Sequence, residues 1–556
     1  MKCKNPVLPG FYPDPSICRV GEDYYLVNST FAYFPGIPVF HSRDLAHWEQ
    51  IGNVLDRESQ LVLEGCGHSQ GIYAPSIRYH KGRFYLVTTN VSGGGNFVVT
   101  AEKPEGPWSE PCYLGEEAQG IDPSLFFDED GTCYYVGQRS RSGGSSYFGD
   151  CEIWLRKLNL DTMKLEGEES VLAYGYAKRA VWPEGPHLYR KDGYYYLLHA
   201  EGGTEQNHCE VAARSRNLRG PYEYAKSNPI LTHRHLGREY PVTCVGHADL
   251  VEDGHGNWYL VTLASRPQEG HTLMGRETFL AKVSWEEDWP VVNPGIGHLE
   301  EQVEMEAREK TESRMEQGLQ TGGLAVRSFP DGELPLYFLT LRGRDKKSIS
   351  VSERKGVLRL HMKKETLREQ AAVAYVAVRQ QQKYFRAETV FELFSGSEGD
   401  CAGLAYVQSN EAQIRIECFR EGERLKVRVI SCSQGNEQIL PDDKSDREKG
   451  SLALLRFCGG EKVSRRIRLR LEVQGLEASC CWKPDEEDSW QQVASGIDLR
   501  PLSTESAGGF VGCTIGMYAS SNGQESCGYA DFHSFSVEPV QDESDQDQAE
   551  REDRSW

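Results

Sequence analysis

Residues 11–27 read FYPDPSICRVGEDYYLV, and this stretch decides the fold. Asp14 stands between Pro13 and Pro15, directly ahead of an apolar run. Proline fixes its own φ and pushes the preceding residue toward an extended conformation. The carboxylate of Asp14 is therefore held on a stiff backbone at the start of a predicted strand. A charged turn with Gly21 and a second strand rich in Tyr, Leu and Val follow, so the stretch predicts a β-hairpin.

The same hairpin pattern occurs five times in the first half of the chain. Each copy has a small or ionisable entry residue, an apolar strand, a turn with charged residues and glycine, and a second strand. The copies start at Asp14, Ala74, Asp122, Gly185 and His247, so the intervals are 60, 48, 63 and 62 residues. Each interval leaves room for four strands. Five four-stranded units at a near-regular period predict a five-bladed β-propeller.

The entry positions of the five repeats are expected to converge, because the first strand of each blade lines the axis of a propeller. Asp14, Asp122 and His247 hold such positions, and Glu184 directly precedes the fourth. A lone Asp-Pro is usually a turn starter. Three acids that meet raise one another's pKa, however, because like charges crowd. The repeat therefore favours a functional site at one end of the channel.

Three converging carboxylates suit glycoside hydrolysis. One carboxylic acid protonates the leaving oxygen, and one carboxylate activates water or attacks the sugar. The third can keep the pKa of the acid high and orient it. The residues by themselves assign no roles among Asp14, Asp122 and Glu184, and they leave inversion and retention both open.

Other side chains near the predicted channel have two interpretations each. His247 is either a packed hairpin histidine or a ligand contact or metal ligand. Arg276 is expected on the third strand of the fifth blade, where it either pairs with an acid or donates to sugar hydroxyls. Phe31, Phe34 and Tyr73 form either an aromatic wall of the site or part of the blade core.

The hairpin repeats end near Pro294, and a different pattern follows. We expect the propeller over residues 1–296 and a charged linker over 297–322. Short alternating strands predict a jelly-roll-like β-sandwich over 323–540. An acidic tail, predicted to be disordered, covers 541–556. The fold class is therefore all-β.

Composition limits the partners and the compartment. The 556 residues carry a formal net charge of -21, which argues against nucleic acid and anionic membranes as partners. No segment approaches ~20 consecutive apolar residues, and the start lacks the apolar core of a signal peptide. The 16 Cys form no CxxC pair. Reduced thiols and a cytoplasmic location are expected.

Several stretches resemble glycoside hydrolase family 43, in its β-xylosidase/α-L-arabinofuranosidase branch. They are NPVLPGFYPDPSIC, GIYAPSIRYHKGRFYLVTTN, GIDPSLFFDEDG, VWPEGPHLYRKDGYYYLLHAEGGT, GHADLVEDGHGNWYLV and GRETFLAKVSW. The resemblance covers residues 5–295. The later part, with VAVRQQQ and GGFVGCTIGMYAS, is similar to the β-sandwich that follows the propeller in that branch.

The resemblance implies roles that the repeat cannot assign. The family is inverting, and Asp14 matches its general base, whereas Glu184 matches its general acid. Asp122 matches the residue that tunes the pKa of the acid and orients it. Arg276 matches the arginine that holds the terminal sugar. His247 matches the channel histidine, which in parts of the family lies beside a bound calcium ion.

The aromatic positions of the resemblance are less uniform. Phe31 matches a pocket aromatic, and Phe510 in GGFVG matches a loop that the sandwich sends over the active-site mouth. Many β-xylosidases of this branch carry Trp in GIWAP, where this chain has Tyr73. The pocket wall therefore differs, which keeps arabinofuranosidase activity open. No cofactor is expected beyond a structural Ca²⁺ near the channel, and relatives often assemble into homo-oligomers.

We therefore expect an exo-acting inverting glycosidase that acts on short xylo- or arabinoxylo-oligosaccharides. It would remove terminal β-D-xylosyl or α-L-arabinofuranosyl units, which the sequence does not rank because one pocket can accept both sugars. A predominantly debranching α-L-arabinofuranosidase is one alternative. A carbohydrate-binding propeller without catalysis is another. A retaining fructosidase-type enzyme is a third, although its NDPNG opening is absent.

Overall fold

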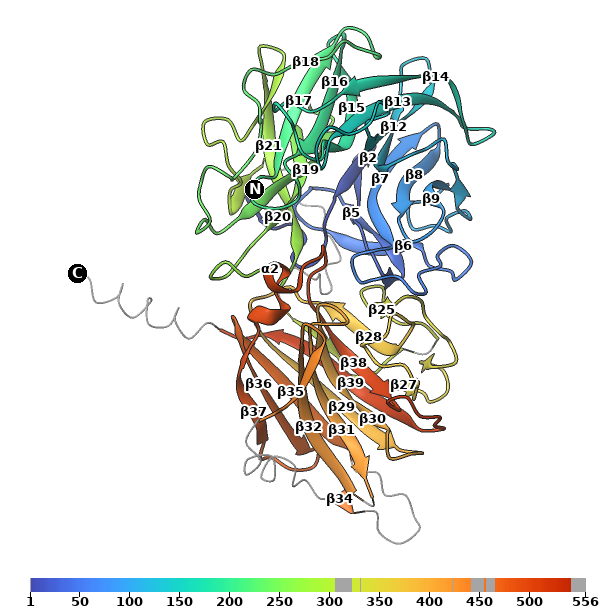
Figure 1. Ribbon diagram of the computed structural model, residues 1–556, viewed down its shortest axis with the longest axis vertical. Coiled ribbons are helices and arrows are strands. Elements are labelled where there is room, and N and C mark those ends of the chain that lie inside the picture. The colour runs from blue at the N-terminus through green and yellow to red at the C-terminus, as the bar shows by residue number, and fades with distance from the viewer. Residues whose placement is uncertain are drawn as a thin grey trace, which may run out of the picture. The chain divides into compact units, whose positions relative to one another are not determined.

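The structure is a computed structural model. It describes residues 2–305, 323–330, 332–422, 424–441, 455–456 and 466–541. The chain divides into two compact units, and strands dominate both of them (Figure 1). The first unit runs from Met1 to Gly270 and continues from Gly275, whereas the second holds His271–Met274 and the chain from Thr321 onward.

Five four-stranded antiparallel sheets build the first unit, and the strands of each sheet are hydrogen-bonded in chain order. The first two sheets are β2 (Ser16–Val20), β3 (Asp23–Val27), β5 (Gly36–Ser42) and β6 (Glu49–Leu55), then β7 (Ile72–His80), β8 (Arg83–Asn90), β9 (Gly95–Ala101) and β10 (Cys112–Tyr113). The third is β11 (Ile121–Phe127), β12 (Cys133–Ser140), β13 (Cys151–Asn159) and β14 (Lys164–Ala173). The last two are β15 (Glu184–Lys191), β16 (Tyr194–Glu201), β17 (Cys209–Ser215) and β18 (Glu223–Tyr224), then β19 (Thr243–Glu252), β20 (Trp258–Ser265), β21 (Arg276–Glu286) and β22 (Trp289–Val292).

These sheets form a closed ring. The first strand of each sheet contacts the first strand of the next, and β19 contacts β2. The first unit is therefore a β-propeller with the five sheets as its blades, which confirms the fold predicted from the repeat. The short strand β4 (Tyr33–Phe34) follows β3. Near the two ends of the unit, β1 (Lys2–Lys4) pairs antiparallel with β23 (Gln302–Glu304).

The repeat found in the sequence is also a repeat of backbone conformation. Asp14, Asp122, Gly185 and His247 have φ values of 50°, 53°, 59° and 54°, so four of the five entry positions are left-handed. The pairing register shifts at the entry positions of β7, β11, β15 and β19. A bulge of this kind bends the strand and re-aims a side chain. The fold thus turns the same position of several blades in the same way.

Two sheets build the second unit. One has the order β26-β27-β39-β29-β35-β36-β37 with β24 on β39, and the other has the order β28-β38-β30-β31-β32-β33 with β34 on β32. The first sheet comprises β24 (Leu324–Val326), β26 (Ile349–Ser350), β27 (Leu358–His361), β29 (Tyr384–Phe394), β35 (Ile467–Gln474), β36 (Glu477–Pro484), β37 (Gln491–Asp498) and β39 (Tyr529–Pro539). The second comprises β28 (Ala374–Arg379), β30 (Cys401–Val407), β31 (Gln413–Glu421), β32 (Arg424–Ser433), β33 (Asn436–Leu440), β34 (Leu455–Arg456) and β38 (Thr514–Ser520). The remaining elements are β25 (Thr340–Leu341), the 3₁₀ turn η1 (Arg500–Leu502) and the short helix α2 (Thr504–Ala507).

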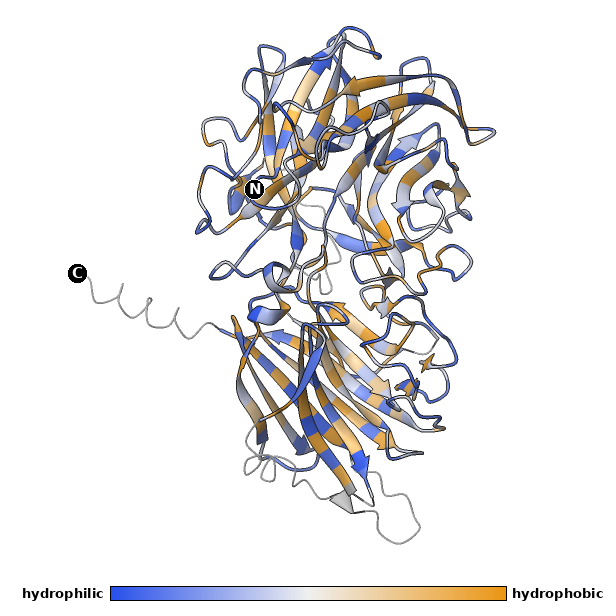
Figure 2. Cartoon of the chain, viewed as in Figure 1, coloured by the Kyte–Doolittle hydropathy of each residue, from blue (hydrophilic) through white to orange (hydrophobic). Residues whose placement is uncertain are grey.

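The two sheets of the second unit enclose one apolar core, which confirms the predicted sandwich. Hydrophobic and hydrophilic residues alternate along its strands (Figure 2). In β35, for example, Ile467, Leu469, Leu471 and Val473 are buried, because successive side chains of a strand point to opposite faces. Phe391 of β29 packs in the same core.

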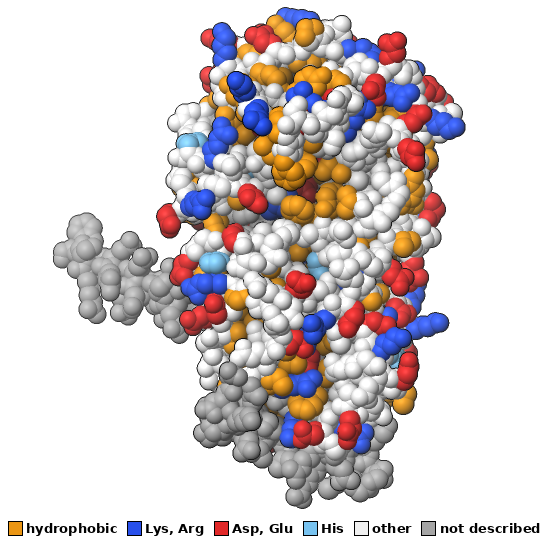
Figure 3. Space-filling view, viewed as in Figure 1, with side chains coloured by type: hydrophobic (Ala, Val, Ile, Leu, Met, Phe, Trp, Pro, Cys, Tyr) orange, Lys and Arg blue, Asp and Glu red, His pale blue; other side chains and the backbone are white. Residues whose placement is uncertain are grey.

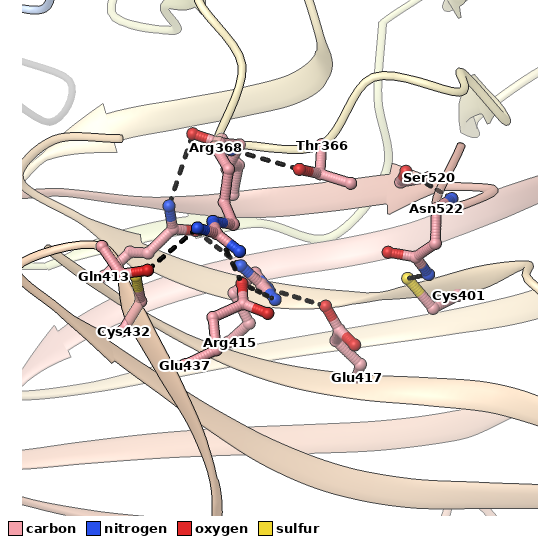
Figure 4. A network of polar contacts seen from close by, with 12 residues as sticks. Thr366, Arg368, Cys401, Gln413, Arg415, Glu417, Cys432, Glu437, Ser520 and Asn522 are labelled. Atoms are coloured by element: carbon pink, nitrogen blue, oxygen red, sulfur yellow. Dashed lines mark hydrogen bonds and ion pairs between the residues drawn. The ribbon is translucent and has the colours of Figure 1, made fainter. Parts of the chain in front are cut away.

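A buried ion-pair network lies on the other sheet of the sandwich (Figure 4). The guanidinium of Arg415 donates to Gln413 at 3.0 Å and to Glu417 and Glu437 at 2.8 Å each. Every charge here has a partner, as burial of charged groups requires. The network therefore has an evident structural role. Residues 306–322 of the predicted linker and 542–556 of the predicted tail lie outside the described residues.

Candidate active site

The three predicted acids stand at the entry ends of three first strands of the propeller. Asp14 precedes β2, Asp122 is the second residue of β11, and Glu184 begins β15. Asp14 and Asp122 are buried, with 5% and 7% of their surface exposed, whereas Glu184 is partly exposed. Figure 3 shows hydrophobic side chains around a hollow on this unit, with acidic side chains inside it. The charges of Asp14 and Asp122 both act on Glu184, so the acids share one site.

Asp14 is held as a carboxylate. The hydroxyl of Ser29 donates to its Oδ2 at 2.5 Å, and Nη1 of Arg276 donates to its Oδ1 at 2.9 Å. Burial by itself raises the pKa of Asp14, but Arg276, His247, Ser29 and His208 together lower it below its ordinary value. This side chain therefore stays ionised and able to accept a proton across the neutral pH range.

Glu184 and Asp122 are shifted in the opposite direction. Burial raises the pKa of Glu184 well above its ordinary value, and the nearby charges of Asp122 and Asp14 raise it further, against the opposing effect of Arg276. Burial likewise raises the pKa of Asp122 to about 6, while His247 opposes the shift. The shift of Glu184 therefore favours its protonated form, and Asp122 is an anion above about pH 6.

His247 lies between the acids and the backbone of the fourth blade. Its Nδ1 is 4.0 Å from Oδ2 of Asp122. A Cβ added at Gly185 would lie 3.0 Å from the imidazole ring, so glycine leaves the space that the ring occupies. The carboxylate of the buried Glu210 accepts the backbone N–H of Ala248 at 3.0 Å and supports the left-handed turn at His247.

Arg276 begins β21, the third strand of the fifth blade, as predicted. Its Nη1 donates to Asp14 and to the hydroxyl of Thr204, at 2.9 and 3.0 Å. Its guanidinium carbon lies 5.8 Å from the centre of the Phe31 ring. The arginine is thus fixed beside the general-base candidate, with an aromatic ring next to it.

The four aromatic candidates lie in three different settings. The rings of Phe31 and Tyr73 lie 5.1 Å apart, and the hydroxyl of Tyr73 donates to the carbonyl of Ser69 at 2.7 Å. Phe34 packs in the apolar core of the first blades, which supports its structural interpretation. Phe510 belongs to the second unit, between α2 and β38, and is 38% exposed. Its role at the active site stays a prediction.

The sequence analysis missed Ser29 and Thr204, which bind Asp14 and Arg276. A usable signal exists for both residues. Ser29 follows β3 and Thr204 follows β16, and each of these strands is the second of its hairpin. A second strand returns the chain to the end at which the first strand began. The residues after each second strand were therefore candidates for the same site.

The side chains near His247 show which oxygen ligands a calcium ion would find there. Among the described residues, no group of three or more His, Cys, Asp or Glu side chains could hold a metal ion. Asp249, two residues beyond His247, is neutralised by the guanidinium of Arg78 at 2.9 Å. Calcium takes six to eight oxygen ligands. Asp249 is therefore already bound by a guanidinium, and the calcium ion near the channel stays a prediction.

Cleavage of a glycosidic bond by general acid and base needs one protonated and one ionised carboxyl group across the bond. The opposite pKa shifts of Asp14 and Glu184, which share one site of the propeller, match such a pair. The fold and the site together thus define a glycoside hydrolase.

Comparison with known proteins gives the family. A family model described as "Glycosyl hydrolases family 43" matches residues 3–290, and a model of the "Beta xylosidase C-terminal Concanavalin A-like domain" matches residues 326–538. The chain belongs to glycoside hydrolase family 43. This confirms the resemblance for both units.

Relatives match over nearly the whole chain. A "Xylosidase/arabinosidase" of Butyrivibrio fibrisolvens is 48% identical over 96% of this chain and 99% of its own. A "Non-reducing end alpha-L-arabinofuranosidase" of Bacteroides ovatus is 34% identical over 96% and 94%. The crystal structure of a xylan β-1,4-xylosidase from Bacillus halodurans is 35% identical, with a TM-score of 0.85, over 96% and 100%.

Asp122→Asn should move the alkaline limb of the pH profile of kcat/KM. If Glu184 is the general acid, as the resemblance implies, activity is lost as pH rises through its pKa, and the charge of Asp122 is one of the causes that raise this pKa. Without that charge the alkaline limb should shift to lower pH. The acid limb follows Asp14, and so it should move much less. A profile with an unmoved alkaline limb would contradict the assigned interaction.

Proposed function

We propose that this protein is an exo-acting, inverting glycosidase that releases terminal β-D-xylosyl or α-L-arabinofuranosyl units from short oligosaccharides. One observation carries the assignment of roles. The pKa of Asp14 is lowered and the pKa of Glu184 is raised within one site. Carboxyl groups whose pKa values are pushed apart in this way act as base and acid, respectively.

In the proposed reaction, Asp14 removes a proton from a water molecule while that water attacks the anomeric carbon. Glu184 donates its proton to the glycosidic oxygen as the bond to the leaving group breaks. The acid and base of inverting enzymes stand roughly 6.5–9.5 Å apart, which leaves room for the water. Asp122 keeps Glu184 protonated, and Arg276 would donate to hydroxyls of the terminal sugar while it holds Asp14.

The names of the relatives support both sugars as substrates, because they include a xylosidase/arabinosidase and an α-L-arabinofuranosidase. Tyr73 favours a sugar preference that differs from that of the β-xylosidases with Trp at this position. Its hydroxyl is tied to Ser69, so the ring cannot fill the space of an indole without losing that hydrogen bond. We infer that the wall beside Phe31 tolerates the arabinofuranosyl ring as well as xylose.

The test is kcat/KM on 4-nitrophenyl β-D-xylopyranoside and 4-nitrophenyl α-L-arabinofuranoside, measured side by side. Turnover of both sugars is expected, with a product of inverted anomeric configuration by NMR. In Tyr73→Trp the ratio should move toward the xyloside. Binding of either sugar without turnover would instead support a carbohydrate-binding propeller, and a product of retained configuration would overturn the inverting mechanism.

The metal requirement is tested in the same assay. We propose that catalysis needs no divalent cation, because Arg78 already neutralises the carboxylate nearest to His247 in its strand. Dialysis against EDTA should leave kcat/KM unchanged, and added Ca²⁺ should not raise it. A loss that Ca²⁺ alone restores would show that the predicted calcium site exists.

We further propose that the enzyme acts in the cytoplasm on imported oligosaccharides. All 15 cysteines that the structure describes are free thiols, which supports a reducing compartment. Separately, no helix among the described residues is long and apolar enough to span a membrane. The expected homo-oligomer stays a prediction.

A further inference from the structure

A buried carboxylate joins four strands of the propeller. Asp249 of β19 is fully buried. From β2 it accepts the hydroxyl of Ser16 at 2.7 Å and the backbone N–H of Ile17 at 3.0 Å. From β7 it accepts two N–H groups of Arg78 at 2.9 and 3.1 Å, and from β15 the hydroxyl of Tyr189 at 2.6 Å.

The hydrogen bonds of this network fix its protonation. Nη2 of Arg78 lies 2.8 Å from Nδ1 of His187. A guanidinium only donates, so Nδ1 of His187 is the acceptor and the ring carries its proton on Nε2. Burial lowers the pKa of His187 to about 3, which keeps the ring neutral. The single charge of Arg78 is thus balanced by the single charge of Asp249.

Two of the four strands that meet at Asp249 are β2, which follows Asp14, and β15, which begins at Glu184. Ser16 lies two residues after Asp14, at the start of β2. Tyr189 lies five residues after Glu184, on β15. These two strands belong to different blades, and the described hydrogen bonds place one carboxylate between them. Asp249 is therefore positioned to hold the base and the acid at a constant separation.

We propose that Asp249 is a positioning residue that sets the separation between Asp14 and Glu184. The inference rests on the proposed function, because only an acid and a base that act across one bond need a set distance. Misplacement of a reacting group by about 1 Å costs on the order of 10²-fold in rate. Nothing in this role requires Asp249 to touch the substrate.

A purely structural role is the competing explanation, and the second unit contains a matched control. Asp531 of β39 is also fully buried and ion-paired. It accepts N–H groups of Arg354 at 2.8 Å and of Arg359 at 2.7 and 3.0 Å. Asp531→Asn thus removes a comparable buried and ion-paired carboxylate, and it changes none of the strands that hold Asp14 and Glu184.

The hydrogen bonds that Asp249 accepts from β15 and from β2 can each be removed by a milder variant, and the two variants should depend differently on the leaving group. Tyr189→Phe removes one hydroxyl from β15 and should disturb Glu184. Its kcat should fall ~5-fold more on a methyl glycoside than on a 4-nitrophenyl glycoside, because only the poor leaving group needs the acid. Ser16→Ala removes one hydroxyl from β2 and should disturb Asp14. Its kcat should fall by the same factor on both substrates.

The experiment measures kcat and KM for the methyl and 4-nitrophenyl glycosides of the sugar that the wild type releases, together with Tm. Asp249→Asn should lower kcat by ~10²-fold with little change in KM. Asp531→Asn should lower Tm and leave kcat per folded molecule and the ratio between substrates unchanged. The proposal would be overturned if Tyr189→Phe had the wild-type ratio of kcat on the methyl glycoside to kcat on the 4-nitrophenyl glycoside. It would also be overturned if the lower Tm of Asp249→Asn accounted for its whole loss of kcat. An inactive wild type would instead reject the proposed function, before any variant is compared.

Discussion

Glu184→Gln should abolish most turnover of substrates with poor leaving groups. The amide keeps the shape of the side chain and cannot deliver the proton that burial and the charges of Asp122 and Asp14 hold on the acid. Removal of a general acid costs on the order of 10²–10⁴-fold. We expect a loss of this size in kcat on methyl glycosides and oligosaccharides. On 4-nitrophenyl glycosides the loss should be far smaller, because that leaving group departs without protonation.

The pH profile of the same variant gives an independent readout. The alkaline limb of kcat/KM should disappear in Glu184→Gln, since the group that titrates there is gone. The acid limb should remain, because Asp14 still has to be ionised. Equal losses on both classes of substrate would argue that Glu184 is not the acid.

Asp14→Asn should impair all substrates to a similar degree. Water must lose a proton whatever the leaving group is, so the loss of the base is expected to cost ~10²–10⁴-fold in kcat on both classes. The acid limb of the pH profile should also vanish, because this limb reflects protonation of Asp14 as pH falls. Steady-state kinetics on the methyl and 4-nitrophenyl glycosides, with Tm as a check of folding, measures both effects.

Asp23→Asn is a matched control for the base variant. Asp23 begins β3 at the turn of the same hairpin, where it pairs with Arg43 at 3.1 Å on the surface. Surface ion pairs contribute little, so this variant should keep its activity and nearly its Tm. A loss in Asp14→Asn that depended on the leaving group would contradict the base assignment.

The position of the acids could be predicted from the sequence because it repeats. Asp14 and Asp122 hold one position of a hairpin that recurs, and the left-handed φ at both residues shows that this position is one backbone conformation. The periodicity of the amino-acid sequence was enough to locate this position. It located Glu184 as well, one residue before a glycine whose missing side chain makes room for His247.

The partners of the acids could not be predicted in the same way. Arg276 binds Asp14 across 262 residues, and Arg78 binds Asp249 across 171. Such pairs depend on how the ring closes and leave no local pattern. The assignment of base and acid depends on these partners, because the same carboxyl group gains or loses its proton according to the charges beside it. The resemblance therefore implies the roles of the acids, and the charges beside each carboxyl group support them.

The entry positions of four blades share one left-handed backbone conformation but carry different side chains. Asp, Asn, Gly and His are residue types that visit this conformation with little strain. Exchanges among these types at Asp122 or His247 would thus change how many protons the site holds while they keep the backbone conformation, whereas Gly185 has to stay glycine because a Cβ there would lie 3.0 Å from the His247 ring. The same backbone conformation therefore carries different side chains in different blades, and a library of variants confined to positions 122 and 247 would change the chemistry of the site on an unaltered ring.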